Sequence, residues 1–185
     1  MQIEKHQIDE LNQQQLAKHK RRFEFAAEGV ANIGEVIKKL SAFNIAIPSW
    51  ALGTGGTRFG RFSGGGEPRS LEEKIEDVGV IHALNKSSNS ISLHIPWDIP
   101  KNASSIKALA SGLGLHFDAV NSNTFQDQPG QKLSYKFGSL HHVDKAVRKQ
   151  AIEHDIEVIK YGVQLESKAL SVWLSDGSNF PGQLN

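Results

Sequence analysis

The chain contains no cysteine, so disulfide bonds and thiolate metal sites are excluded. It also has no apolar run long enough to cross a bilayer. Its first residues, 1–6, are polar and lack the apolar core of a signal peptide. From these absences we expect a cytoplasmic protein without a membrane partner.

An excess of charge of either sign is also missing. The 21 Lys and Arg residues nearly balance the 20 Asp and Glu residues, which gives a formal net charge of +1. The chain therefore has no general field to attract nucleic acid, and its one basic cluster lies at residues 19–22. Base-stacking aromatic residues are not interleaved with this cluster, so we expect a solvated helix face and no nucleic-acid partner.

Apolar residues, by contrast, are plentiful enough for a core: 38% of the 185 residues are hydrophobic, which is typical of one soluble globular domain. Helical and strand-like segments alternate. Helices are predicted over 8–40 with a break near Gly29 or Gly34, from Ser70 onward, over 102–113 and over 143–165, and strands over 44–49, 91–95, 115–121 and 169–174. This order predicts an α/β fold with a parallel sheet that is either open or part of something larger.

Two of these helices carry specific signals. Ser70 and Glu73 have the spacing of a capping box, in which each side chain accepts a hydrogen bond from the other residue's backbone N–H. In the longest predicted helix, Ile152, Ile156 and Ile159 recur at helical spacing.

The glycine-rich segment after the first predicted strand imitates nucleotide-binding motifs. Arg58 stands where a dinucleotide fingerprint needs its third glycine, and the phosphate-loop spacing over 55–60 is followed by Arg61 and Phe62 instead of lysine and a hydroxyl. Nucleotide binding is therefore disfavoured. A plain surface loop would explain the glycines alone, but Phe59 and Phe62 indicate a loop that reaches over a pocket or into a neighbouring subunit.

All three tryptophans stand where a predicted strand gives way to a loop. Trp50 follows the first strand, Trp97 the second, and Trp173 lies near the end of the fourth. In parallel α/β proteins the carboxyl ends of the strands form the ligand-binding face. The three rings therefore predict one aromatic-lined site.

His94 is the residue with most chemical promise, because it ends the second strand on the same face. Asp98, four residues on, has the spacing to accept an imidazole N–H and fix the tautomer of the ring. A buried histidine bound to backbone is an equally good interpretation of this spacing. We expect the other histidines, including His141, His142 and His154, to lie at the surface.

Polar groups accompany the rings at two strand ends. Residues 121–125 and 176–182 combine amides and hydroxyls with a phenylalanine each, of which Phe125 is a further candidate wall. Taken singly these are typical turn residues. Together, hydrogen-bonding groups beside aromatic faces suit a carbohydrate, whose C–H face stacks on rings.

Several blocks of sequence together are similar to the bacterial L-rhamnose isomerases of the broad-specificity type: residues 47–50, 53–59, 92–98, 117–125 and 176–183. The resemblance implies a (β/α)₈ barrel of the xylose-isomerase kind, of which this chain is the N-terminal half, with a helical extension over 1–40 and a partial TIM-barrel domain over 41–185. It further implies a homotetramer and Mn²⁺-dependent interconversion of L-rhamnose and L-rhamnulose or related rare sugars.

The resemblance also assigns roles. His94 would contact the ring oxygen of the sugar or its neighbouring hydroxyl and assist ring opening, Phe59 would enter the neighbouring subunit's site, and four residues would line the sugar site: Trp50, Trp97, Phe125 and Trp173. The family's metal ligands lie on strands five to eight, which this chain lacks, so we expect the chain alone to be inactive. The alternative is a non-catalytic sugar-binding half-barrel that needs a partner chain.

Overall fold

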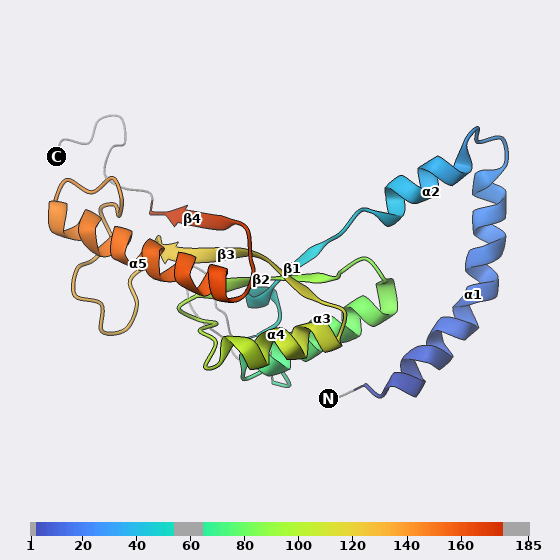
Figure 1. Ribbon diagram of the computed structural model, residues 1–185, viewed down its shortest axis with the longest axis horizontal. Coiled ribbons are helices and arrows are strands. Elements are labelled where there is room, and N and C mark those ends of the chain that lie inside the picture. The colour runs from blue at the N-terminus through green and yellow to red at the C-terminus, as the bar shows by residue number, and fades with distance from the viewer. Residues whose placement is uncertain (1–2, 54–64, 176–185) are drawn as a thin grey trace.

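Four parallel strands form a single sheet in the computed structural model, which describes residues 3–53 and 65–175. The strands lie in chain order, β1 (Ala46–Pro48), β2 (Ser90–Ile95), β3 (His116–Thr124) and β4 (Leu170–Leu174), as Figure 1 shows. The predicted α/β class is confirmed, and the arrangement matches half of a (β/α)₈ barrel.

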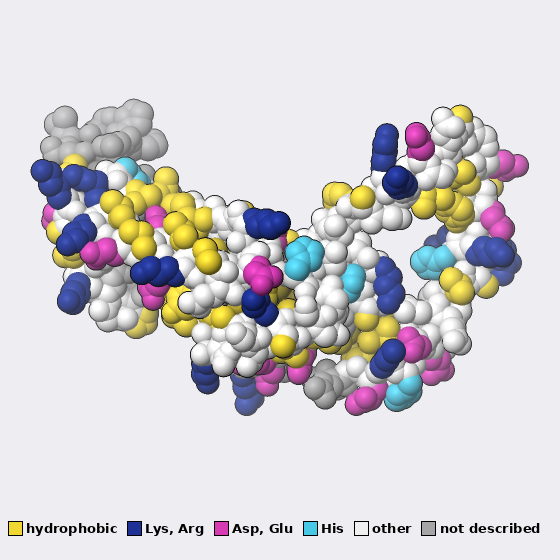
Figure 2. Space-filling view, in the orientation of Figure 1, with side chains coloured by type: hydrophobic (Ala, Val, Ile, Leu, Met, Phe, Trp, Pro, Cys, Tyr) yellow, Lys and Arg dark blue, Asp and Glu magenta, His cyan; other side chains and the backbone are white. Residues whose placement is uncertain are grey.

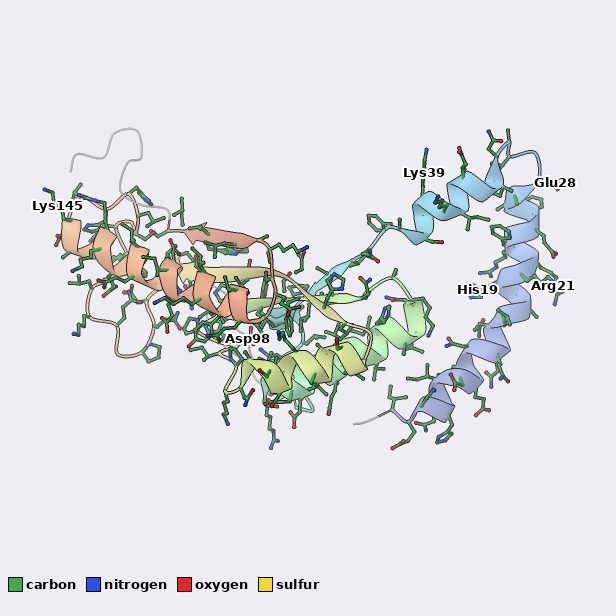
Figure 3. The ribbon with its side chains drawn as sticks, viewed as in Figure 1. His19, Arg21, Glu28, Lys39, Asp98 and Lys145 are labelled. Atoms are coloured by element: carbon green, nitrogen blue, oxygen red, sulfur yellow. The ribbon has the colours of Figure 1, made fainter. Side chains whose placement is uncertain are left out.

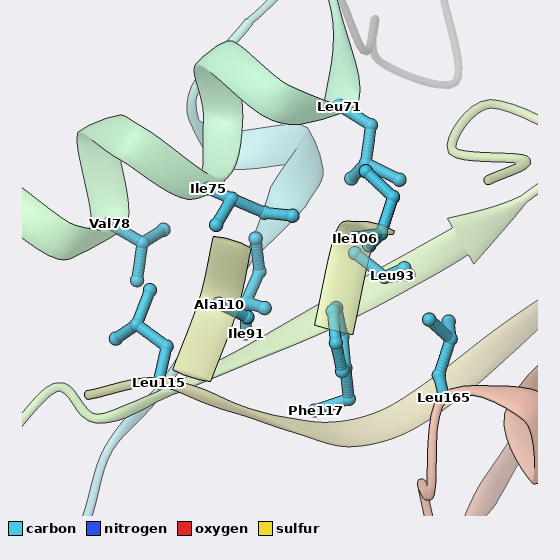
Figure 4. Packing of buried hydrophobic residues seen from close by; sticks show 10 residues of the cluster. All are labelled: Leu71, Ile75, Val78, Ile91, Leu93, Ile106, Ala110, Leu115, Phe117 and Leu165. Atoms are coloured by element: carbon cyan, nitrogen blue, oxygen red, sulfur yellow. The ribbon is translucent and has the colours of Figure 1, made fainter. Parts of the chain in front are cut away.

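Three helices connect successive strands, α3 (Leu71–Asn85), α4 (Ala103–Gly112) and α5 (Lys145–Gln164). Alternate strand residues turn towards these helices and form the core. The main hydrophobic cluster joins α3 and α4 to the sheet (Figure 4). Its fully buried members include Ile75, Val78, Ile91 and Leu93. The opposite set of strand residues is therefore left to form the other face of the sheet.

An arm of two helices precedes the sheet. α1 (Lys5–Ala27) and α2 (Ile33–Ser41) are separated by a turn in which Gly29 has a φ of +78°, so the predicted break is confirmed. The arm extends away from the sheet and turns back (Figure 1). Ile8, near its start, is buried. The boundary at residue 40 between an extension and a barrel domain stays a prediction.

The start of α3 follows the capping prediction in part. The Ser70 side chain accepts a hydrogen bond from the Glu73 N–H at 3.2 Å, as expected of an N-cap. The Glu73 carboxylate, however, accepts from the N–H of Arg69 at 2.5 Å, one residue before the cap. The N-cap is thus formed, but the Glu73 side chain binds the N–H of Arg69 instead of the N–H of Ser70.

α5 buries a different face from the one that its isoleucine repeat marks. Ile152, Ile156 and Ile159 are each nearly half exposed, and Figure 2 shows hydrophobic side chains gathered over α5. The sheet is contacted by a neighbouring stripe of smaller residues that includes Val158 and Gly162. A Cβ at Gly162 would lie 3.0 Å from Val120 Cγ2, so small residues on this stripe allow close packing of the helix on the sheet.

Two further expectations concern surface partners. Over 3–53 and 65–175, no helix has the length and apolar content needed to span a membrane. The basic cluster at 19–22 is exposed on α1, on the arm and away from the sheet (Figure 3). Its residues form a solvated helix face, as predicted.

Candidate functional site

The carboxyl ends of the four strands bring five rings together, as predicted from the placement of the tryptophans. Trp50 lies in a short 3₁₀ helix, η1 (Ser49–Ala51), directly after β1, and Trp97 follows β2. Phe125 follows β3, and Trp173 is part of β4. We call these four residues and His94 the aromatic cluster.

His94 is at the centre of this cluster. Its ring stacks on Trp97 with a centroid separation of 4.0 Å and an interplanar angle of 27°. Three other rings approach it more steeply, with centroids 5.5 Å (Trp50), 5.9 Å (Phe125) and 6.5 Å (Trp173) away. The four aromatic residues that the resemblance assigns to the sugar site therefore all place their rings around His94.

The environment of His94 keeps its imidazole neutral. The side chain is 2% exposed, and burial is the main reason that the pKa of His94 falls from 6.5 to about 4. The negative charge of Asp98 raises this pKa, whereas His154 and Lys74 lower it further. His94 Nε2 is buried, and within the described part of the chain it has no hydrogen-bond partner. The ring is therefore a neutral imidazole whose buried Nε2 has no hydrogen-bond partner among the described residues.

Asp98 lies where the sheet meets α3 (Figure 3) and holds His94 through the main chain. Its Oδ2 accepts a hydrogen bond from the backbone N–H of His94 at 2.8 Å and from the hydroxyl of Ser49 at 2.5 Å. Its Oδ1 accepts from Lys74 Nζ at 2.7 Å, which forms a buried ion pair. Binding of the imidazole by Asp98 stays a prediction, while the backbone contact is direct.

A second polar connection fixes Trp173. β3 runs to Thr124, three residues beyond its predicted end, so residues 122–124 belong to the strand rather than to a loop. Asn121 Nδ2 donates to the Leu93 carbonyl at 2.8 Å, and its Oδ1 accepts from Trp173 Nε1 at 3.0 Å. One amide therefore ties the indole of β4 to the backbone of β2.

Asn123 adds polar capacity to the same face of the sheet. It pairs in register with Trp173, just as Asn121 pairs with His94, and paired residues of parallel strands project to the same side. Its side chain is 2% exposed, and neither its Nδ2 nor its Oδ1 has a hydrogen-bond partner among the described residues. Buried amides usually have hydrogen-bond partners, so the donor and acceptor of Asn123 are unused among the described residues.

One of the histidines expected at the surface is in fact structural. The His154 side chain is 17% exposed, and its Nε2 accepts a hydrogen bond from the backbone N–H of Asn123 at 3.0 Å. The prediction for His154 was wrong because the isoleucine stripe suggested a different buried face for α5. Its burial also lowers its pKa.

Sequence reasoning missed Lys74 as part of this site. Lys74 sits on the core-facing side of α3, between Leu71 and Val78 at helical spacing, and a lysine in an apolar stripe was the available signal. Phe59 and residues 176–182, which sequence reasoning also assigned to the site, lie outside the described residues.

The described residues do not fit the Mn²⁺ that the resemblance implies. A catalytic metal needs several converging imidazole or carboxylate ligands. Within 3–53 and 65–175, no group of three or more such residues is arranged to hold a metal ion. Asp98, the carboxylate next to His94, is occupied by Lys74, Ser49 and the backbone.

The fold is a parallel α/β sheet whose strand ends carry a cluster of aromatic rings beside buried polar side chains. Sequence comparison adds relatives. The chain is 56% identical over 154 residues to a probable sugar isomerase of Rhizobium meliloti, covering 83% of this chain and 36% of that protein. It is also 56% identical over 157 residues to a probable sugar isomerase of Mesorhizobium japonicum, covering 85% of this chain and 36% of that protein. No family model matches.

The matched stretch thus spans little more than a third of each relative's length. The similarity supports a relationship to sugar isomerases in general.

Proposed function

We propose that this chain forms the sugar-binding wall of a sugar isomerase that interconverts L-rhamnose and L-rhamnulose. The observation that carries the proposal is the aromatic cluster around a buried, neutral His94 whose Nε2 has no partner among the described residues. The names of the two relatives support the isomerase class. The choice of rhamnose rests on the sequence resemblance.

The proposed chemistry of the cluster follows from its parts. Indole and phenyl faces stack on the C–H face of a pyranose, and the Asn123 amide offers a donor and an acceptor to sugar hydroxyls. Ring opening removes the proton of the anomeric hydroxyl as the bond between the anomeric carbon and the ring oxygen breaks, and that oxygen takes up a proton. A neutral His94 is in the correct state to accept the first of these protons.

The remaining parts of the proposal concern the whole protein. When bound, Mn²⁺ would polarise the carbonyl and hydroxyl oxygens of the open sugar, and its ligands would have to come from outside the described residues. A cytoplasmic homotetramer, with Phe59 contributing to a neighbouring subunit's site, belongs to the same proposal.

Titration of the intact chain with L-rhamnose, followed by tryptophan fluorescence, tests sugar binding. We expect saturable quenching with a dissociation constant of about 1 mM, near 4 kcal/mol of binding free energy. Trp97→Ala removes the ring stacked on His94 and should abolish the response, whereas Phe137→Ala, at an exposed ring remote in sequence, should not. Quenching by glycerol equal to that by L-rhamnose, or unchanged binding by the Trp97 variant, would contradict the proposal.

The second candidate is a non-catalytic half-barrel that pairs with another chain. The exposed apolar residues of β4 and α5 favour it, since Val172 and Leu174 are 41% and 53% exposed at the last strand of the described sheet. Both candidates require sugar binding at the aromatic cluster. They differ in whether the chain, joined to its complement, produces L-rhamnulose.

A further inference from the structure

We infer that Lys74, Asp98 and Ser49 form a buried clamp that sets the relative position of His94 and Trp50. The three residues come from separate parts of the fold: α3, the turn after β2, and η1 after β1. Lys74 is 7% exposed, Asp98 2% and Ser49 0%. A lysine and an aspartate are seldom buried to this degree unless they are paired, as they are here.

One carboxylate connects the two sides of the aromatic cluster. On one side, Asp98 accepts from the His94 N–H at 2.8 Å, while its own N–H donates to the His94 carbonyl at 2.9 Å, which closes a tight turn. On the other side, the same oxygen accepts from the Ser49 hydroxyl, and Ser49 directly precedes Trp50. The backbones carrying the two rings, whose centroids are 5.5 Å apart, are therefore bound to a single group.

Lys74 supplies the positive charge that compensates the buried carboxylate of Asp98. Without the ammonium group at 2.7 Å, the Asp98 carboxylate would be buried with only neutral donors around it. The lysine stem is also packed closely: a Cβ at Gly53 would lie 3.4 Å from Lys74 Cε and 3.2 Å from the Pro68 carbonyl oxygen. The ion pair thus joins α3 to both strand ends, and Lys74, Asp98 and Ser49 are positioning residues.

The clamp also acts on His94 through charge. The groups that influence the imidazole are Asp98, which raises its pKa, and His154 and Lys74, which lower it. Removing the Lys74 charge should therefore raise the pKa of His94. A residue that merely filled space would leave that titration unchanged.

The test uses three variants of the intact chain without sugar. Lys74→Met keeps the apolar stem and removes the charge, and Ser49→Ala removes one hydroxyl from the clamp. Lys107→Met is the matched control, because it breaks an ion pair of the same 2.7 Å length with the exposed Glu166. The measurements are the NMR titration of the His94 imidazole, the NMR resonance of the Trp50 indole, and the tryptophan near-ultraviolet circular dichroism.

We expect Lys74→Met to move the His94 titration upward from about 4 and to reduce the near-ultraviolet signal by about half or more. Ser49→Ala should alter the near-ultraviolet signal and the Trp50 indole resonance, and it keeps the inference testable if the lysine variant does not fold. Lys107→Met should leave all three readouts unchanged. Unaltered readouts in a folded Ser49→Ala chain, or in a folded Lys74→Met chain, would overturn the clamp.

The use of the clamp in sugar binding rests on the proposed function, and there we expect about tenfold weaker L-rhamnose binding in the Ser49 variant. The proposed function and the clamp are contradicted by different results. A native chain that binds no sugar contradicts the proposed function, whereas the ring and titration readouts, measured without sugar, decide the clamp.

Discussion

At the scale of single residues, His94 shows how burial competes with charge. An adjacent carboxylate ordinarily favours a protonated imidazole, and Asp98 does raise the pKa of His94. Burial nevertheless has the larger effect and lowers this pKa to about 4, partly because Lys74 offsets the charge of Asp98. The result is a base that is unprotonated throughout the neutral range.

This shift predicts acid sensitivity. Because the folded-state pKa lies below 6.5, the unfolded chain binds the proton first as the pH falls, and stability declines between about 6.5 and 4. His94 alone would account for about 3 kcal/mol of loss. His154 acts in the same direction, whereas Asp155, whose pKa is raised by burial, opposes it.

Urea unfolding from pH 7 to pH 4 measures this effect. We expect His94→Gln to flatten the decline relative to the unaltered chain, while His19→Gln, at an exposed position on α1, leaves the slope unchanged. An equal slope in the unaltered chain and the His94 variant would show that the imidazole is not held neutral.

The residue types of the site could be predicted from sequence, but several of their contacts could not. Trp50, Trp97 and Trp173 converge because the ends of parallel strands share one edge, which local spacing already implies. The partners of Asp98 come from α3 and η1, 24 and 49 residues away along the chain. Spacing within a strand end carries no information about such distant donors.

At the scale of elements, α5 is informative because its most obvious apolar stripe is not its buried one. Ile156 is 46% exposed, whereas Val158, two residues on, is fully buried and packs with Ile95 and Val120. The repeat predicts the helix correctly but not its rotation about its axis. That rotation is set by the small residues that let the helix approach the sheet.

The two positions should respond differently to truncation. Val158→Ala removes buried carbon atoms and should lower the free energy of unfolding by about 2 kcal/mol, while Ile156→Ala should change it by about 0.5 kcal/mol or less. Chemical unfolding of both variants provides the comparison. Equal losses would mean that Ile156 is as buried as Val158.

The Asn121 side chain connects β3 to both of its neighbouring strands at the site. Asn121→Ala removes the bonds to the Leu93 carbonyl and to Trp173 Nε1, and we expect a loss of about 1–3 kcal/mol in stability. We also expect altered fluorescence, because the indole of Trp173 loses its acceptor. Ser104→Ala, at an exposed position in α4, is the control and should alter neither property.

At the scale of the whole molecule, the parallel order of the strands places every described member of the aromatic cluster at one edge of the sheet. Helices cover the other face of the strands, so the cluster lies on the side that would face the interior of a closed barrel. The α/β order could be predicted from the alternation of patterns along the chain. The contacts of the exposed apolar surfaces of β4 and α5 could not be predicted, because they involve groups beyond the described residues.

The proposed function separates a sugar-binding wall from the metal centre, and this separation predicts the activity of the chain alone. Aldose–ketose isomerisation moves hydrogen between adjacent carbons and needs polarisation of both oxygens. The aromatic cluster provides the neutral imidazole of His94, and the described residues include no group of three metal-binding side chains. We therefore expect purified residues 1–185 with added Mn²⁺ to form no L-rhamnulose from L-rhamnose above a protein-free blank. The fluorescence titration with L-rhamnose serves as the control for an intact site. Turnover above the blank would show that the chain is a catalyst by itself.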